Sequence, residues 1–219
     1  QRLASEYADA LSAGKSVLAV APSHKEGRAV TAAIRTALQE RHVLGAEHER
    51  CAVLLNLHLT DAEKADADNY QPEQVLQFHR NAPGIKSGER MTVQAVDGEG
   101  ITAQSADGTT HRVGFNQAVA FQLFQPDQIE LAAGDVIRIT RNGRTLDDER
   151  LNNGDLLGIG GFTETGDLIT SKGVIPRGFG NLTYGYCSTS HASQGKTVDQ
   201  VFIAQSECSK SASSAEQFY

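Results

Sequence analysis

A short apolar run at residues 17–21 (VLAVA) constrains the fold most, because Pro22 ends it and a helix signal follows. Continuous runs of Val, Leu and Ala are typical of strands that are buried in a parallel sheet. Ser23 and Glu26 have the spacing of a capping box, in which the serine begins a helix. Apolar residues then recur every four positions over residues 30–38 and mark one helical face. A strand, a loop and a helix in this order predict an α/β fold that binds ligands at the carboxyl end of the strand.

The sequence changes in character near residue 84, where short β-like runs begin to alternate with glycine-rich turns. Asp97-Gly98 and Asp107-Gly108 are hairpin-type turn dipeptides. Short strands at this spacing predict a β-rich insertion of the small antiparallel barrel type. Strand-like runs at 182–189 and 198–204 indicate a return to core strands. We therefore expect three segments: the first part of an α/β domain at 1–83, the insertion at 84–178, and the rest of the α/β domain at 179–219.

The charge balance excludes a protein that holds nucleic acid by bulk positive charge, because 27 Asp and Glu outnumber 20 Lys and Arg. It leaves room for a local basic strip, and residues 136–146 contain arginines and no acid. Three cysteines without a C-x-x-C pair argue against a disulfide framework and favour a reducing, cytoplasmic compartment. Since no apolar run approaches the roughly 18 residues of a membrane helix, we expect no membrane span.

Two tripeptides resemble the end of a phosphate-binding loop, and both fail the structural test for one. Gly14-Lys15-Ser16 lacks the first glycine of the motif and precedes a strand instead of following one. Gly195-Lys196-Thr197 leads into the strand-like run 198–204, so no helix amino end would receive the phosphate. The chain therefore has no complete nucleotide site of its own.

The densest group of side-chain donors lies in residues 184–204 (YGYCSTSHASQGKTVDQVFIA), between two strand-like runs. Polar loops held by a rigid sheet are frequent functional positions. A plain Ser/Thr-rich turn explains the same composition equally well, so the residues alone leave both interpretations open.

The segment TSHASQGKTVDQV resembles motif V of superfamily 1 helicases of the kind fused to conjugative relaxases, the TraI/TrwC or MobF family. Three further segments match the same family in the same order. They are Pro22-Ser23-His24 with Ile34-Arg35 in the following helix, the stretch GDVIRITRN at 134–142 with LNNGD at 151–155, and SSAEQFY at 213–219, which resembles the lead-in to motif VI. The resemblance covers nearly the whole chain.

The resemblance implies a fragment of an ATP-dependent DNA helicase or translocase. Such helicases have two RecA-like domains with ATP and Mg²⁺ in the cleft between them and single-stranded DNA across their top. This chain resembles the second RecA-like domain, with a mainly parallel sheet. Its implied partners are single-stranded DNA, the first RecA-like domain of the same polypeptide and other conjugative transfer proteins, in the bacterial cytoplasm. Because Gln1 is not a natural start and Tyr219 falls in a motif lead-in, we expect a fragment that binds no ATP or Mg²⁺ alone and lacks ATPase activity.

The resemblance also assigns site residues by position. Motif V, which in the family couples DNA to the nucleotide cleft, comprises Thr189, His191, Ser193, Gln194, Gly195, Lys196 and Thr197. Further DNA-binding candidates are Ser23, His24, Arg138, Arg141 and Asn142, and Arg35 is the candidate arginine of the ATP cleft.

The chemistry of these residues is compatible with that assignment. Hydroxyl and amide groups bind phosphate oxygens without sequence preference, and a glycine lets the backbone approach closely. Asp199 would repel phosphate, so we expect it to orient the loop. Each arginine also has a purely structural interpretation. Arg35 follows Ile34, so its side chain should point away from the core and could simply be solvated. Arg138 and Arg141 could lie on the solvent-exposed face of a strand.

Two other classes of function stay open on the sequence. A non-enzymatic protein-interaction module derived from a helicase domain would use the β-rich middle. A hydrolase using His191 with Ser188 or Ser193 would need a nucleophile on a strained turn, and the chain has no G-x-S-x-G elbow. Cys187 and His191 have metal-ligand spacing but no second ligand pair, so we predict no metal site.

Overall fold

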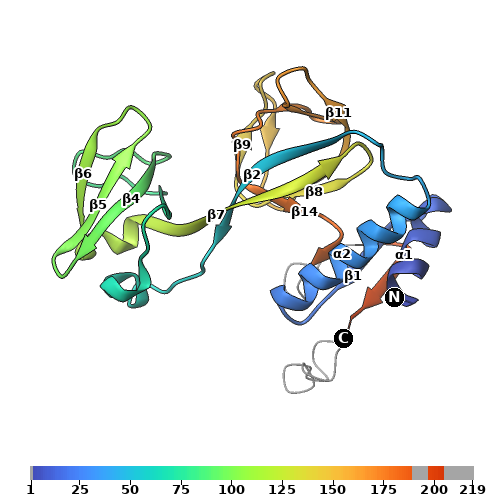
Figure 1. Cartoon of the computed structure of the whole chain (residues 1–219), viewed down its shortest axis with the longest axis horizontal. Helices are drawn as coiled ribbons and strands as arrows, with labels where there is room; N and C mark the ends of the chain where they lie inside the picture. Colours follow the sequence, from blue (N-terminus) through green and yellow to red (C-terminus); the bar gives the residue numbers. More distant parts are fainter. Residues whose placement is uncertain (1, 189–196, 205–219) are drawn as a thin grey trace. The chain divides into compact units, whose positions relative to one another are not determined.

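The computed structural model describes residues 2–188 and 197–204, and its chain divides into two compact units (Figure 1). Unit 1 comprises Gln1–Cys51 and Glu130–Tyr219, and unit 2 comprises Ala52–Ile129. These boundaries differ from the expected ranges 1–83, 84–178 and 179–219. They fall within two strands, β2 (His48–Asn56) and β7 (Phe121–Ala132).

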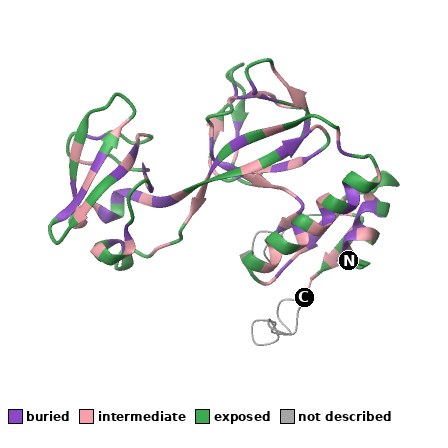
Figure 2. Ribbon diagram, viewed as in Figure 1, coloured by how far each residue is buried: buried purple, intermediate pink, exposed green. Residues whose placement is uncertain are grey.

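The α/β part of unit 1 is built on the strand that the sequence predicted. β1 (Val17–Val20) lies between β15 (Cys187–Ser188) and β16 (Gln200–Ile203) in a three-stranded sheet, and both pairings are parallel. The helices α1 (Arg2–Ser12) and α2 (His24–Glu40) pack together with Ala19 and Phe202 in one core. Buried and exposed residues alternate along both helices, as amphipathic helices require (Figure 2).

The rest of unit 1 is an open antiparallel sheet in the order β13-β12-β11-β8-β14. The strands are β8 (Val136–Ile139), β11 (Leu156–Phe162), β12 (Leu168–Thr170), β13 (Gly173–Ile175) and β14 (Leu182–Tyr184). A separate two-stranded ladder joins β9 (Gly143–Arg144) to β10 (Arg150–Leu151). Ala132, Val136 and Tyr186 pack into the same core as α1 and α2. These contacts explain why residues that we assigned to an insertion belong to the α/β unit.

Unit 2 has its own core, formed on a six-stranded sheet in the order β2-β7-β3-β4-β5-β6. Its other strands are β3 (Val75–Phe78), β4 (Arg90–Asp97), β5 (Gly100–Ser105) and β6 (Thr110–Gly114). The 3₁₀ turns are η1 (Glu63–Ala65), η2 (Ala67–Asn69) and η3 (Phe115–Ala120). The two predicted hairpin turns are confirmed: one connects β4 to β5, and the other connects β5 to β6, where Gly108 has a φ of +87°.

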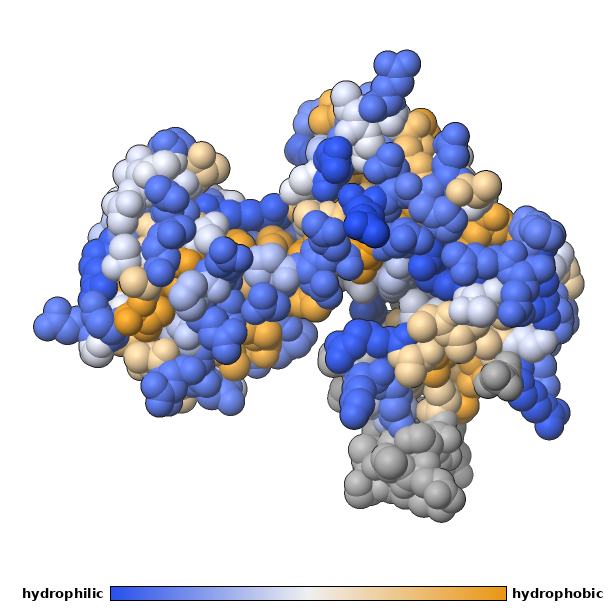
Figure 3. Space-filling view, in the orientation of Figure 1, coloured by the Kyte–Doolittle hydropathy of each residue, from blue (hydrophilic) through white to orange (hydrophobic). Residues whose placement is uncertain are grey.

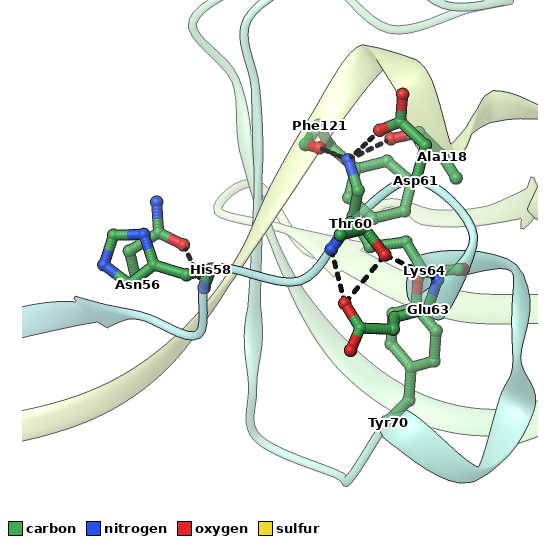
Figure 4. A network of polar contacts seen from close by, with 9 residues as sticks. All are labelled: Asn56, His58, Thr60, Asp61, Glu63, Lys64, Tyr70, Ala118 and Phe121. Carbon is green, nitrogen blue, oxygen red and sulfur yellow. Dashed lines mark hydrogen bonds and ion pairs between the residues drawn. The ribbon is translucent and has the colours of Figure 1, made fainter. Parts of the chain in front are cut away.

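A buried lysine organises one end of unit 2 (Figure 4). The Lys64 side chain is 0% exposed, and its Nζ lies 2.6 Å from the carbonyl oxygen of Ala118 and 2.8 Å from that of Phe121. The carboxylate of Asp61 lies 2.9 Å from the same nitrogen, and the Tyr70 hydroxyl donates to the Lys64 carbonyl at 2.6 Å. All three donors of the ammonium are therefore satisfied, which is the condition for burying such a charge.

The observed sheets correct the fold prediction in two respects. The sheet is not mainly parallel, because parallel pairing among the described strands is confined to β15-β1-β16, whereas the five-stranded sheet and the ladders from β7 through β6 are antiparallel. The β-rich region also forms no closed barrel among the described strands: β13 and β14 are the opposite edges of one sheet, and β2 and β6 are the edges of the other.

Within the described ranges, no helix is long and apolar enough to cross a membrane. On the face that Figure 3 shows, hydrophilic residues cover most of the surface and apolar residues form scattered patches.

Candidate nucleic-acid interface

The carboxyl ends of β1 and β15 lie side by side. Val20 is in register with Ser188, and the amide of Ala21 donates to the Ser188 carbonyl at 3.0 Å. Pro22 and Ser23 follow β1 directly, while Ser188 is the last described residue before motif V. The predicted ligand edge of the α/β unit is therefore formed by the segment that leads into Pro22-Ser23-His24 and by Ser188, which precedes motif V in the sequence.

Ser23 begins α2 as the predicted capping box. Its Oγ accepts a hydrogen bond from the amide of Glu26 at 3.2 Å and donates to the Glu26 carboxylate at 3.2 Å. The Ser23 hydroxyl is thus already used at the start of the helix. His24 is the first residue of α2. Contact of either residue with DNA stays a prediction.

Most of motif V lies outside the described residues. This applies to Thr189, His191, Ser193, Gln194, Gly195 and Lys196, so their assignment stays a prediction. Thr197 is described and is exposed, three residues before β16.

Asp199 ties the amino ends of β1 and β16 together. Its Oδ2 accepts hydrogen bonds from the Ser16 amide at 2.8 Å and from the Ser16 hydroxyl at 2.7 Å. These hydrogen bonds lower the pKa of the Asp199 carboxyl. Asp199 thus holds the start of β16 against the start of β1, and the expectation that it orients the motif V loop stays a prediction.

Arg138 projects from β8 between two core residues. Ile137 and Ile139 are fully buried, whereas Arg138 is half-buried. The predicted alternation of buried and less buried side chains is therefore present, but the arginine does not lie on a fully solvent-exposed face. Its Nη1 lies 3.5 Å from the Oγ of Ser188, which makes a long hydrogen bond. Burial lowers the pKa of Arg138. The arginine therefore reaches the carboxyl edge of the parallel sheet from a different sheet.

Arg141 and Asn142 lie in the loop that follows β8. Arg141 is partly buried, and burial lowers its pKa. The side-chain oxygen of Asn142 accepts from the amide of Asn153 at 2.7 Å. Because the amide of Gly154 also donates to the Ile139 carbonyl at 2.8 Å, the two motif stretches GDVIRITRN and LNNGD form one local structure.

Arg35 forms a buried, two-pronged ion pair with Asp135. Its Nε and Nη2 each lie 2.9 Å from a different carboxylate oxygen, and the guanidinium stacks 4.7 Å from the centre of the Tyr184 ring. The Arg35 side chain is 13% exposed and that of Asp135 is 0% exposed. Asp135 also accepts from the Tyr186 hydroxyl at 2.7 Å and the Ala132 amide at 2.8 Å.

This ion pair corrects the expectation that Arg35 points away from the core. Burial opposes the charged form, but hydrogen bonding and attraction to Asp135 raise the pKa of Arg35 above its ordinary value. A role for Arg35 at the ATP cleft stays a prediction, and it would require the guanidinium to exchange or share Asp135. Sequence reasoning missed Asp135 as a partner, although the acid stands in the motif stretch GDVIRITRN.

Among the residues that the structure describes, no group of three or more His, Cys, Asp or Glu side chains is arranged to hold a metal ion.

Two known proteins are similar in sequence to most of the chain. The multifunctional conjugation protein TraI of Escherichia coli K12 is 26% identical over 175 residues, which cover 78% of this chain and 10% of TraI. A second Escherichia coli TraI matches to the same extent. The chain thus spans a tenth of the length of these relatives. No family model matches the chain.

Solved structures of Pif1 helicases align with much of the chain but at low scores. A structure of two coordinating Pif1 helicases at forked double-stranded DNA is 12% identical, covers 86% of this chain and 32% of its own, and has a TM-score of 0.23. Bacteroides Pif1 in complex with ADP-AlF3 and single-stranded DNA is 15% identical, with coverages of 87% and 34% and a TM-score of 0.22. TM-scores this low do not establish a common fold. The sequence matches agree with the resemblance that the motifs carry: the chain is similar to a part of the TraI conjugation proteins.

Proposed function

We propose that the chain is part of an ATP-dependent DNA helicase or translocase of the TraI type, in which it contributes contacts to single-stranded DNA and one wall of the ATP cleft. The observation that carries the proposal is that segments on either side of two motif stretches reach one residue, Ser188, at the carboxyl edge of the parallel sheet. The amide of Ala21, which precedes Pro22-Ser23-His24, donates to the Ser188 carbonyl, and Arg138 of the GDVIRITRN stretch donates to the Ser188 hydroxyl.

The chemistry of this edge suits a sugar-phosphate backbone. Open α/β sheets bind ligands at the carboxyl ends of their strands. A guanidinium and hydroxyl groups donate hydrogen bonds to phosphate oxygens and read no sequence, as a translocating motor requires. The net charge of −7 limits the attraction to local basic positions and favours release of the strand.

The nucleotide chemistry belongs to the complete protein in this proposal. The unit built on β1 would be the second RecA-like domain, and ATP with Mg²⁺ would lie between it and the first RecA-like domain of the same polypeptide. The isolated chain would lack ATPase activity, since its sequence contains no Walker A loop. Other conjugative transfer proteins are further proposed partners, in the bacterial cytoplasm.

Fluorescence anisotropy with a labelled single-stranded oligonucleotide at low salt tests the proposal. We expect binding that weakens as salt rises, and weaker binding for Arg141→Ala and Lys196→Ala than for the control Arg112→Ala, which breaks an exposed ion pair in unit 2. No binding by the wild-type chain, or equal binding by all variants, would contradict the DNA contacts. DNA-stimulated ATP hydrolysis by the pure chain would contradict the assignment of nucleotide chemistry.

The interaction-module alternative predicts a different pattern. Co-purification with conjugative transfer proteins in the absence of any affinity for single-stranded DNA would favour it over the helicase proposal.

A further inference from the structure

We propose that Arg138 and Ser188 form a subsite for a single phosphate group at the carboxyl edge of the parallel sheet. The inference rests on the proposed function and narrows it to one phosphodiester position and two named donors.

The position of Arg138 in its sheet leaves the guanidinium without a carboxylate from the neighbouring strand positions. Arg138 is in register with Leu156 of β11 on one side and with Thr183 of β14 on the other. Its chain neighbours Ile137 and Ile139 point to the opposite face, because side chains alternate along a strand. The stem of the arginine therefore lies between an apolar and a neutral polar residue, and the charged end extends toward Ser188.

Several other arginines in the described part of the chain have an acidic partner, and this contrast is informative. The pairs are Arg35 with Asp135, Arg41 with Asp9, Arg112 with Asp97, and Arg144 with Asp148. Among the described residues, no carboxylate lies within ion-pair distance of Arg138. Its hydrogen-bond partner there is the neutral Ser188 hydroxyl, at 3.5 Å.

A half-buried guanidinium that has no acid beside it in the described part of the chain carries a charge that an anion would balance. Arginine has five N–H donors in a planar fork that matches two phosphate oxygens, and Ser188 engages at most one of them weakly. When the Ser188 Oγ accepts from Arg138, its own proton is left to donate to the same anion. Both donors would then face one phosphate group.

The neighbouring start of α2 does not explain the site. Its capping box already pairs the Ser23 hydroxyl with the Glu26 amide, and the Glu26 carboxylate adds negative charge to the first turn. The expected anion contacts are therefore those of Arg138 and Ser188, and the helix start serves to hold the strand ends in place.

The first experiment measures binding of inorganic phosphate by thermal unfolding of the whole chain, with chloride at equal ionic strength as the reference. We expect phosphate to raise the Tm of the wild-type chain and of Arg144→Gln, in which an exposed and already paired arginine is removed. We expect Arg138→Gln to lose most of this rise. An equal rise in Arg138→Gln and wild type would overturn the subsite.

The second experiment measures the salt dependence of binding to single-stranded DNA. Loss of one phosphate contact should lower the slope of log Kd against log salt by about 0.7 and weaken binding about tenfold at low salt in Arg138→Gln. Arg138→Lys retains the charge but not the fork, so it should keep the slope and lose part of the affinity. This second variant also serves if Arg138→Gln does not fold.

The two experiments separate the two proposals. If the wild-type chain binds DNA but Arg138→Gln matches it in both assays, the subsite is wrong and the DNA-binding function stands. If phosphate stabilises the chain through Arg138 but the chain does not bind DNA, the subsite stands as a site for free phosphate and the proposed DNA contacts fail.

Discussion

Replacing Asp135 by asparagine should destabilise unit 1 strongly, because Asp135 is the centre of a buried polar network. The substitution removes the charge that balances Arg35 and one of the oxygens that accept from Arg35, Tyr186 and the Ala132 amide. Removing one partner of a buried ion pair costs about 3–5 kcal/mol, since the remaining charge stays desolvated. The introduced side-chain amide would retain some hydrogen bonds, so we expect a loss near the lower end of that range, about 3 kcal/mol, for Asp135→Asn.

Urea unfolding followed by circular dichroism at 222 nm measures this effect. Both described α-helices belong to unit 1, so the helical signal reports on that unit. Asp148→Asn is the matched control: its side chain is 82% exposed in a surface pair with Arg144, and its φ of +63° suits asparagine. We expect this control to change stability by less than about 0.5 kcal/mol.

The double variant Arg35→Met with Asp135→Asn completes the test. If the two groups are coupled, the double variant should be clearly more stable than the sum of the single effects implies, because neither charge is left alone. A loss below about 1 kcal/mol for Asp135→Asn, or additive single effects, would refute the view that this pair stabilises unit 1 as a buried ion pair.

Three further predictions concern other parts of the chain. Lys64→Met should destabilise unit 2 by about 2–4 kcal/mol, because two buried carbonyls lose their donor. Asp61→Asn should cost less, because its side chain is 65% exposed and asparagine keeps an oxygen that can accept from Lys64. Hydrogen exchange of unit 2 amides measures both effects. Gly134→Ala should lower the free energy of unfolding by about 2 kcal/mol or more, since the φ of Gly134 is +90° and a Cβ would lie 2.8 Å from a carbonyl oxygen. Gly154→Ala should lower it by about 1 kcal/mol, because Gly154 has a similar φ of +93° but open space around it. Urea unfolding of both variants measures the difference. The hydrogen bond from Arg112 is the main cause that lowers the pKa of Asp97 to about 2. The ionised carboxylate should therefore contribute stability that is complete above about pH 4 and is lost as the pH falls toward 2. An NMR titration of this carboxyl that gave a pKa near 4 would contradict the prediction.

Local signals in the sequence predicted local structure well. The apolar run at 17–21 is β1 with its flanking residue, and the serine and glutamate that follow it form the predicted capping box. The Asp-Gly dipeptides mark the turns on either side of β5. Each of these signals depends on residues within one turn or one strand, so a single sequence contains all the information that is needed.

Pairing across long distances could not be predicted in the same way. The run 182–189 indicated a return to core strands, and its later part, β15, does pair parallel with β1. Its first part, β14, pairs antiparallel with β8 instead, because an apolar strand does not specify its neighbour. Arg35 lies off the apolar stripe of α2 and so looked solvated, yet a carboxylate from a distant segment covers it. Arg138 was proposed as a site residue from a family resemblance, and its contact with Ser188 could be found only from the fold.

The pairing of Arg35 with Asp135 also has an evolutionary consequence. Either residue alone is hard to replace, since a single change leaves a buried charge without its counterpart. Relatives that change one position should therefore change the other as well, and a pair of apolar residues would be the simplest joint replacement. Positions 35 and 135 should thus vary together between lineages, and this correlation would persist in relatives that no longer bind DNA.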